Sequence, residues 1–204
     1  MNKRGLIHWA IWISVISGIY CSIYAVTIGA YTSAHVLPGW HVVYVTFTAL
    51  PIYFISGAKR KEFFNFCGSY IVGVLWGMLY LVIMDRLNAY GWPWWLNLGV
   101  VVAAVCTVEC ALHFCLPAKL PFNVVPAQFG AISNTFWCSN LSLLILGQGG
   151  RTAISGFYNF KAMPIVMITL CTGTLLGLIC NEGLHFIDAE TGKWTWPSRQ
   201  KTAA

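Results

Sequence analysis

Two carboxyl–imidazole pairs lie inside apolar stretches of the chain and are the residues best suited to chemistry. Glu109 and His113 are four residues apart, and Glu182 and His185 are three apart, so each pair shares one face of a helix. A carboxylate in hydrocarbon is costly and marks a functional position. A di-iron bundle needs two Glu-x-x-His motifs and two further carboxylates, and these spacings do not supply them. We therefore expect no metal and no cofactor, and a gating or proton-linked role for these four residues.

A second set of polar side chains lies at residues 122–140, which read FNVVPAQFGAISNTFWCSN. Polar groups in hydrocarbon must find partners, and they face a bundle interior or a water-filled path. Pro126 and Gly130 favour a kinked or broken helix at this point. Two interpretations stay open: the polar residues only bond neighbouring helices, or they line a solute pathway. For the second, the candidate lining residues are Thr46, Phe47, Thr48, Trp76, Gln128, Phe129, Ser133 and Asn134.

Composition indicates the elements that must position these residues. The chain has 204 residues, of which 58% are hydrophobic and 9% charged, whereas soluble domains carry about 25% charged residues. Stretches of about 20 apolar residues are long enough to cross a bilayer as helices. We predict an all-α integral membrane protein in one domain with six transmembrane helices: Leu6–Ala30, Trp40–Ser56, Cys67–Met84, Trp94–Leu116, Phe122–Leu146 and Met163–His185.

Positive charges predict the orientation of these helices. With six crossings, both termini lie on one side, together with the lysines and arginines of residues 59–61, Lys119 and the tail at residues 188–204. The opposite side carries only Arg86, Arg151 and Lys161. The positive-inside rule therefore places both termini in the cytoplasm. The net charge of +6 is explained by these loops, so we expect no nucleic-acid partner.

The apolar stretches repeat in the same order. A Leu-Pro segment followed by Val-Val opens the second and fifth stretches, Gly-x-x-x-Gly recurs in the third and sixth, and a cysteine recurs in the first and fourth: Leu37 with Leu120, Gly73 with Gly173, and Cys21 with Cys106. This register sets Thr46 against Gln128. Three crossings per half require the second half to be inverted. The predicted repeats are residues 1–87 and 93–187.

Three motifs resemble a known family: GVLWGM at residues 73–78, YFISG at 53–57 with Lys59 soon after, and VPAQF at 125–129 followed by Thr135-Phe136. They are similar to the Gly-Val-x-Trp-Ala-Met and Val-Pro-Gly-x-Phe patterns of small bacterial inner-membrane proteins of unknown function, the domain of unknown function 1097 family. This chain departs from the pattern with Ala127 where glycine is usual, and with longer termini and loops. The resemblance covers the second to sixth stretches. It implies a multi-pass inner-membrane protein and supplies no substrate.

Two functions from different classes fit these patterns. An inverted repeat with a polar helix is typical of transporters and channels whose solute site lies between the halves. We expect a channel or facilitator for a small neutral or weakly charged polar solute that is urea-, amide- or amine-like. The alternative is a non-catalytic subunit or assembly partner of a larger membrane complex. The chain shows no phosphate-binding loop and no nucleophile elbow, so we expect no enzyme. We expect the partners to be the solute, lipid and further copies of the chain in a homo-oligomer, with a trimer favoured.

Overall fold

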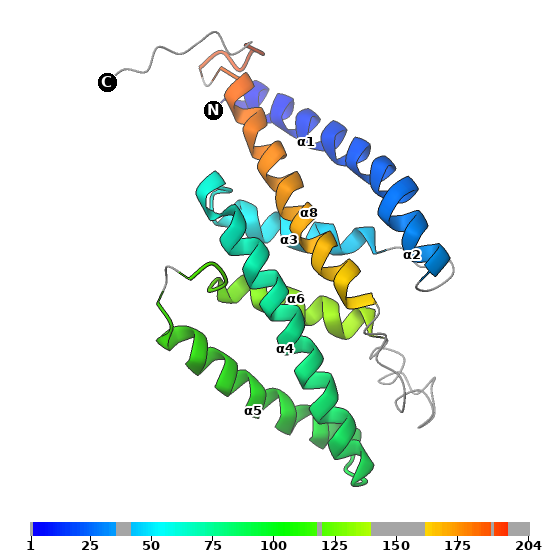
Figure 1. Ribbon diagram of the computed structural model, residues 1–204. Coiled ribbons are helices and arrows are strands. Elements are labelled where there is room, and N and C mark those ends of the chain that lie inside the picture. Colours follow the sequence, from blue (N-terminus) through cyan, green and yellow to red (C-terminus); the bar gives the residue numbers. More distant parts are fainter. Residues whose placement is uncertain (1, 36–41, 118–119, 140–161, 189, 196–204) are drawn as a thin grey trace.

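The computed structural model describes residues 2–35, 42–117, 120–139, 162–188 and 190–195 (Figure 1). Within these ranges the regular secondary structure is helical apart from an isolated antiparallel bridge between Ile187 and Trp194, which confirms the predicted all-α fold. The helices are α1 (Lys3–Tyr24), π-helical η1 (Ala25–Gly29), α2 (Ala30–His35), α3 (Val43–Ile55), 3-10 η2 (Arg60–Glu62), α4 (Phe63–Ala89), α5 (Trp94–Cys115), α6 (Val125–Cys138), α8 (Met163–Glu182) and 3-10 η5 (Gly183–Phe186).

Among the described residues, four helical segments are long and apolar enough to cross a membrane: Lys3–His35, Arg60–Ala89, Trp95–Cys115 and Met163–Phe186. These are the helices of a membrane protein. The expected second and fifth crossings differ, because α3 and α6 have 13 and 14 residues. At 1.5 Å per residue such helices are about 20 Å long, whereas the hydrocarbon core is about 30 Å thick. Residues 40–41 and 140–146 of those two expected crossings lie outside the described residues.

Pro126 does not kink a helix, contrary to the sequence-based expectation. The helix α6 begins at Val125, so Pro126 lies in its first turn. The backbone nitrogen there has no partner within the helix in any case, and proline is favoured for that reason. The proline inside a described helix is Pro51 in α3. The polar residues of α6 therefore lie on one continuous helix.

Several segments gather at one end of the molecule. Asn2 donates a hydrogen bond to the carbonyl of Glu190, which joins the start of α1 to the segment after α8. The Arg60 guanidinium binds the Glu182 carboxylate at the end of α8. Figure 1 places the start of α4 at this end and the end of α4 away from it. The basic residues at 3–4 and 59–61 therefore share one end of the bundle.

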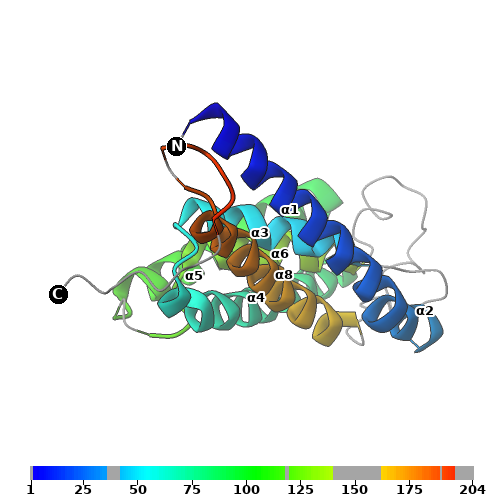
Figure 2. The same cartoon turned by 90° about the horizontal axis from the view of Figure 1, so that it is seen from above.

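The helices of the two predicted repeats, residues 1–87 and 93–187, pack mainly on helices of the other repeat (Figures 1 and 2). The helix α3 of the first half packs on α8 of the second, and α6 of the second packs on α4 of the first. The outer helices follow the same pattern, because α1 packs on α8 and α5 packs on α4. Figure 1 shows that α4 and α8 run in opposite directions, as do α3 and α6. The contacts of α3 and α1 with α8 thus have counterparts in the contacts of α6 and α5 with α4.

Glycines permit these close contacts. A Cβ atom on Gly73 would lie 2.5 Å from the Gln128 carbonyl oxygen and 2.8 Å from the Ala131 Cβ. A Cβ atom on Gly173 would lie 2.7 Å from the Thr46 carbonyl oxygen and 3.0 Å from the Ala49 Cβ. Small residues let helix backbones approach in this way. The two contacts correspond in the repeat register, since Ala131 follows Gln128 by the same interval as Ala49 follows Thr46.

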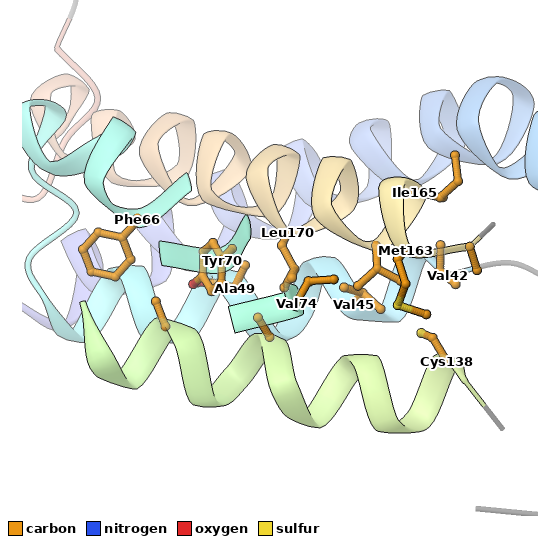
Figure 3. Packing of buried hydrophobic residues seen from close by; sticks show 14 of the residues in the cluster. Val42, Val45, Ala49, Phe66, Tyr70, Val74, Cys138, Met163, Ile165 and Leu170 are labelled. Carbon is orange, nitrogen blue, oxygen red and sulfur yellow. The ribbon is translucent and has the colours of Figure 1, made fainter. Parts of the chain in front are cut away.

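An apolar cluster fills the space between the four central helices (Figure 3). Tyr70 and Val74 of α4, Ala49 of α3 and Leu170 of α8 are fully buried there. A separate cluster around Tyr80 joins α4 to α5 and includes residues of α6. The second cluster borders Glu109, which accepts a hydrogen bond from Tyr80.

Candidate functional site

The helix α5 turns one stripe of residues toward α4. Asn97, Val101, Val105, Glu109 and His113 recur at every fourth position, and each is buried, with Glu109 fully so. Residues four apart lie on one helical face. The stripe begins with an amide, continues with two valines and ends with the predicted carboxyl–imidazole pair.

Two hydrogen bonds, with Trp76 and Asn123, fix His113. Trp76 of α4 donates its indole N–H to His113 Nε2 at 3.1 Å. Because an indole nitrogen only donates, Nε2 is the acceptor, and this bond fits the neutral imidazole tautomer whose proton lies on Nδ1. The Nδ1 atom lies 3.0 Å from Asn123 Oδ1, which can accept that proton. The network assigns this tautomer and holds the ring between α4, α5 and the segment before α6.

Gln128 adjoins the imidazole from α6. Its amide nitrogen lies 3.1 Å from His113 Nδ1 and donates to the Phe122 carbonyl at 2.7 Å. Its Oε1 atom is buried and has no hydrogen-bond partner. An unpaired buried polar atom costs about 1–3 kcal/mol. Gln128 therefore presents a free acceptor beside His113.

Glu109 presents a second free acceptor one helical turn away. Tyr80 donates its hydroxyl to Glu109 Oε2 at 3.2 Å, whereas Oε1 is buried without a partner. In the described part of the chain Glu109 makes no ion pair with a lysine, arginine or histidine. A buried carboxyl group without a cation needs its own proton or a donor from a ligand. Glu109 on α5 and Gln128 on α6 thus each carry one unpaired acceptor oxygen, and each oxygen would be satisfied by a hydrogen-bond donor.

A separate chain of hydroxyl groups joins α1, α3 and α8. The Tyr20 hydroxyl lies 3.0 Å from Thr46 Oγ1 and 2.8 Å from Thr172 Oγ1. Thr172 donates to the Thr169 carbonyl, so Thr172 accepts from Tyr20, and Tyr20 accepts from Thr46. Tyr24 makes a parallel contact with Thr169 at 2.6 Å. Sequence reasoning missed Tyr20, although the hydroxyl of a tyrosine inside an apolar stretch must find a partner.

The remaining predicted lining residues do not join these clusters. Phe47, Phe129 and Ser133 are exposed on the outer surface. Asn134 donates to the Gly130 carbonyl of its own helix. Thr48 faces Gly130, where a Cβ atom would lie 3.6 Å from the threonine methyl. The eight candidates therefore divide among two polar clusters, a helix crossing and the surface, and they do not line one continuous path.

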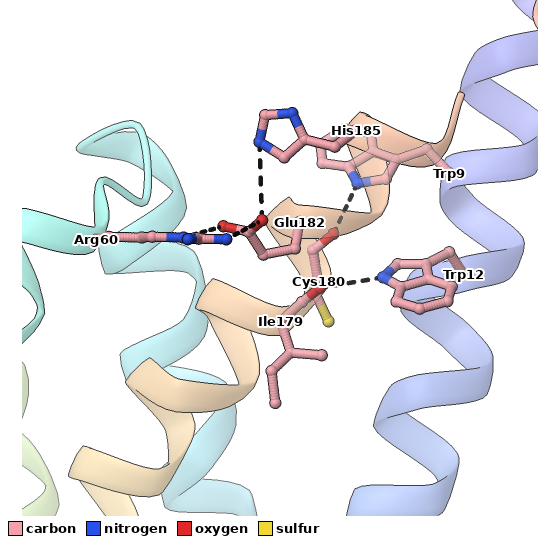
Figure 4. Close-up of polar contacts among 7 residues, drawn as sticks. All are labelled: Trp9, Trp12, Arg60, Ile179, Cys180, Glu182 and His185. Carbon is pink, nitrogen blue, oxygen red and sulfur yellow. Dashed lines mark hydrogen bonds and ion pairs between the residues drawn. The ribbon is translucent and has the colours of Figure 1, made fainter. Parts of the chain in front are cut away.

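Glu182 and His185 lie at the end of α8 in a different setting (Figure 4). Arg60 binds the Glu182 carboxylate through two nitrogens, at 2.8 Å and 2.6 Å. His185 Nε2 lies 3.8 Å from the same carboxylate. The arginine side chain is 75% exposed, so solvent screens the pair. The sequence-predicted pairs at 109–113 and 182–185 are thus different in kind, one buried without a cation and one paired at the surface.

Two tryptophans of α1 donate hydrogen bonds to backbone carbonyls at the end of α8. The last four carbonyls of a helix lack partners within it. Trp9 donates to the Cys180 carbonyl at 3.0 Å, and Trp12 donates to the Ile179 carbonyl at 3.1 Å (Figure 4). Gly183 packs directly against the Trp12 ring. These bonds fasten α1 to α8 beside the Glu182 ion pair.

Two cavities lie outside the carboxyl–imidazole cluster. One of about 440 Å³ is lined by Trp12, Phe186, Trp194 and Thr195, at the end where Asn2 contacts Glu190. The other, of about 260 Å³, lies between α4 and α8 and reaches Thr172. Across the part of the chain that the structure describes, no three histidine, cysteine or acidic side chains come together as a metal site.

The chain matches no family model, no curated protein and no solved structure.

Proposed function

We propose that this chain is a membrane channel or facilitator for a small polar solute bearing N–H groups, such as urea or a primary amide. The observation that carries the proposal is the pair of unpaired buried acceptors, Glu109 Oε1 and Gln128 Oε1, beside His113. Each lacks a hydrogen-bond donor, and N–H groups supply donors. Membrane sites of this kind are costly and are associated with solute pathways.

The reciprocal packing of the two halves supports this function. Inverted repeats in transport proteins place the solute site near the midplane where the halves meet. Gln128 and His113 belong to the second half and Trp76 to the first, so the cluster lies at such a junction. In the proposal, Glu109 has a proton-linked role, since its protonation state decides whether Oε1 donates or accepts.

The cellular setting is part of the proposal. The basic residues at 3–4 and 59–61, together with both termini, face the cytoplasm of a bacterial inner membrane in this proposal, in accord with the positive-inside rule. The Arg60–Glu182–His185 contact then lies at the cytoplasmic mouth, where it has a gating role. The chain acts as a homo-oligomer, which native mass spectrometry of detergent-purified protein would measure.

Stopped-flow light scattering of proteoliposomes tests the function. We expect faster flux of urea and formamide than in empty liposomes, and a smaller gain for glycerol, which has a similar size and no N–H group. Replacement of Gln128 by leucine should lower urea flux about tenfold, the loss expected for about one hydrogen bond. Thr135→Val is the matched control, because Thr135 is buried on the same helix and its hydroxyl bonds only the Ala131 carbonyl.

The outcome that would refute the proposal is clear. Equal permeability of protein-containing and empty liposomes to every solute would exclude a facilitator. A flux that Gln128→Leu leaves unchanged would place the pathway elsewhere. The control variant separates these outcomes from general damage to α6, because Thr135 packs against Gly77 through side-chain atoms of the same shape as valine.

A further inference from the structure

One face of α1 carries a cation at its start and an aromatic ring two turns later. Arg4, His8 and Trp12 recur at every fourth position, so they share this face. The face lies against the segment after α8, because a Cβ atom on Gly192 would lie 3.2 Å from the Arg4 Cβ. His8 Nδ1 donates to the Gly192 carbonyl at 2.8 Å, and its ring stacks on Trp194 with the ring centroids 5.5 Å apart. The segment therefore covers this face from its charged end to its aromatic end.

The cavity of about 440 Å³ lies at the aromatic end of this face. Its walls are the rings of Trp12, Phe186 and Trp194, together with Thr195. The centroid of the Trp12 ring lies 5.7 Å from that of Phe186 and 6.3 Å from that of Trp194. Cavities of roughly 300–1,000 Å³ with apolar and aromatic walls are typical of small-molecule sites. Three aromatic rings form most of the wall, so the cavity is suited to a hydrocarbon chain.

The charged end of the same face offers more positive than negative charge. Lys3, Arg4 and Lys193 are exposed there. The acids of the adjoining segment are Asp188 and Glu190, and Asp188 Oδ1 already accepts two backbone N–H groups of its own turn. An anionic group would therefore find unpaired cations beside the entrance to an apolar cavity.

We propose that this cavity binds an anionic phospholipid, with one acyl chain between the aromatic rings and the phosphate beside Arg4 and Lys193. The apolar helical segment Lys3–His35 begins at this end, so the cavity lies where lipid headgroups and acyl chains meet. Lysine and arginine residues next to a membrane attract anionic lipids. The bound lipid contacts both α1 and the segment after α8, and it therefore stabilises the attachment of one to the other.

Native mass spectrometry of the full chain, purified in detergent, tests this site. Phosphatidylglycerol and phosphatidylcholine with identical acyl chains are titrated separately, and the affinity of the first bound lipid is compared. We expect phosphatidylglycerol to bind at least about fivefold more tightly, and Arg4→Gln to remove about fivefold of its affinity, the effect of one basic residue beside an anionic lipid. Arg86→Gln is the matched control, because Arg86 is exposed near the other end of the molecule, in the last turn of α4.

A second variant tests the cavity itself. Thr195→Phe places a ring in the cavity and should weaken the binding of both phospholipids. Thr107→Phe is its control, because Thr107 is exposed on α5. Glycerol phosphate, which has the charged group without an acyl chain, should not displace phosphatidylglycerol at an equal concentration. Displacement by glycerol phosphate would contradict the role of the cavity.

The remaining outcomes decide the inference without reference to solute flux. Equal affinity of the unaltered protein for the two phospholipids would overturn it. A preference for phosphatidylglycerol that neither Arg4→Gln nor Thr195→Phe reduces would place the lipid elsewhere and would overturn it as well. If Thr195→Phe fails to fold, Arg4→Gln gives the test, because it changes an exposed side chain.

Discussion

The close approach of α4 to α6 and of α3 to α8 gives a quantitative prediction for glycine-to-alanine substitutions. A Cβ atom on Gly73 would lie 2.5–2.8 Å from two backbone atoms of Gln128 and from the Ala131 Cβ. Backbone atoms cannot rotate away, so the helices must separate. Overpacking of this kind costs about 1–3 kcal/mol. Since two of the three contacts are with backbone, we expect the upper part of that range, about 2–3 kcal/mol.

The repeat register supplies a second variant and the structure supplies a control. Gly173→Ala meets the Thr46 backbone at 2.7 and 3.0 Å and the Ala49 Cβ at 3.0 Å, so its cost should be similar and slightly smaller. Gly99 of α5 has no atom within 4 Å of the position of a Cβ. Gly99→Ala should be neutral or stabilise the protein by up to about 1 kcal/mol through helix propensity.

Equilibrium unfolding of the purified protein in detergent micelles measures these differences. The expected order of unfolding free energies is Gly99→Ala at or above the unaltered protein, then Gly173→Ala, then Gly73→Ala. Equal stability of Gly73→Ala and Gly99→Ala would show that α4 and α6 do not approach as closely as described. A large cost for Gly73→Ala alone would contradict the equivalence of the two halves.

Three further predictions concern the end of the molecule at which Asn2 contacts Glu190. Trp12→Phe should lower the unfolding free energy by about 1 kcal/mol, measured in the same micelles, because it removes a hydrogen bond to an α8 carbonyl. Glu182→Gln should cost less than about 1 kcal/mol, with a smaller difference at high salt, because Arg60 is mostly exposed; a salt-independent loss would contradict this. The backbone N–H and hydroxyl of Thr191 lower the pKa of Asp188, so its stabilising effect is present above the unfolded pKa and is lost as pH falls through the folded value. Thr191→Val should raise the Asp188 pKa in an NMR titration, and an unchanged value would assign the shift to other groups.

The sequence predicted the long helices, for a physical reason. Length and apolar composition decide whether a segment can cross hydrocarbon, and four segments satisfy both requirements. Gly73 and Gly173 each lie where a Cβ atom would meet backbone atoms of a neighbouring helix. Apolar composition did not predict the lengths of α3 and α6, because the apolar stretches in the sequence are longer than the helices described in the structure.

The candidate site was predicted in part. The spacing of Glu109 and His113 fixes them on one face, and the structure turns that face toward α4. Their partners depend on tertiary packing: Trp76, a candidate lining residue, donates a hydrogen bond to His113. Arg60 is 122 residues from Glu182, and no local pattern links them. The π-helical turn at Ala25–Gly29 likewise has no local sequence signal that we recognise.

The attachment of α1 to α8 has a consequence for biogenesis. The helix α1 is synthesised before its principal partner α8, which ends at Glu182. At synthesis rates of about 5–20 residues per second, α1 waits roughly ten to thirty seconds for α8. During that interval it stands in lipid without its main contact. Only 6% of the apolar window in Lys3–His35 is buried even in the finished protein, so α1 can lie in lipid before α8 is made. The hydrogen bonds from Trp9 and Trp12 to the α8 carbonyls form only after α8 has been synthesised.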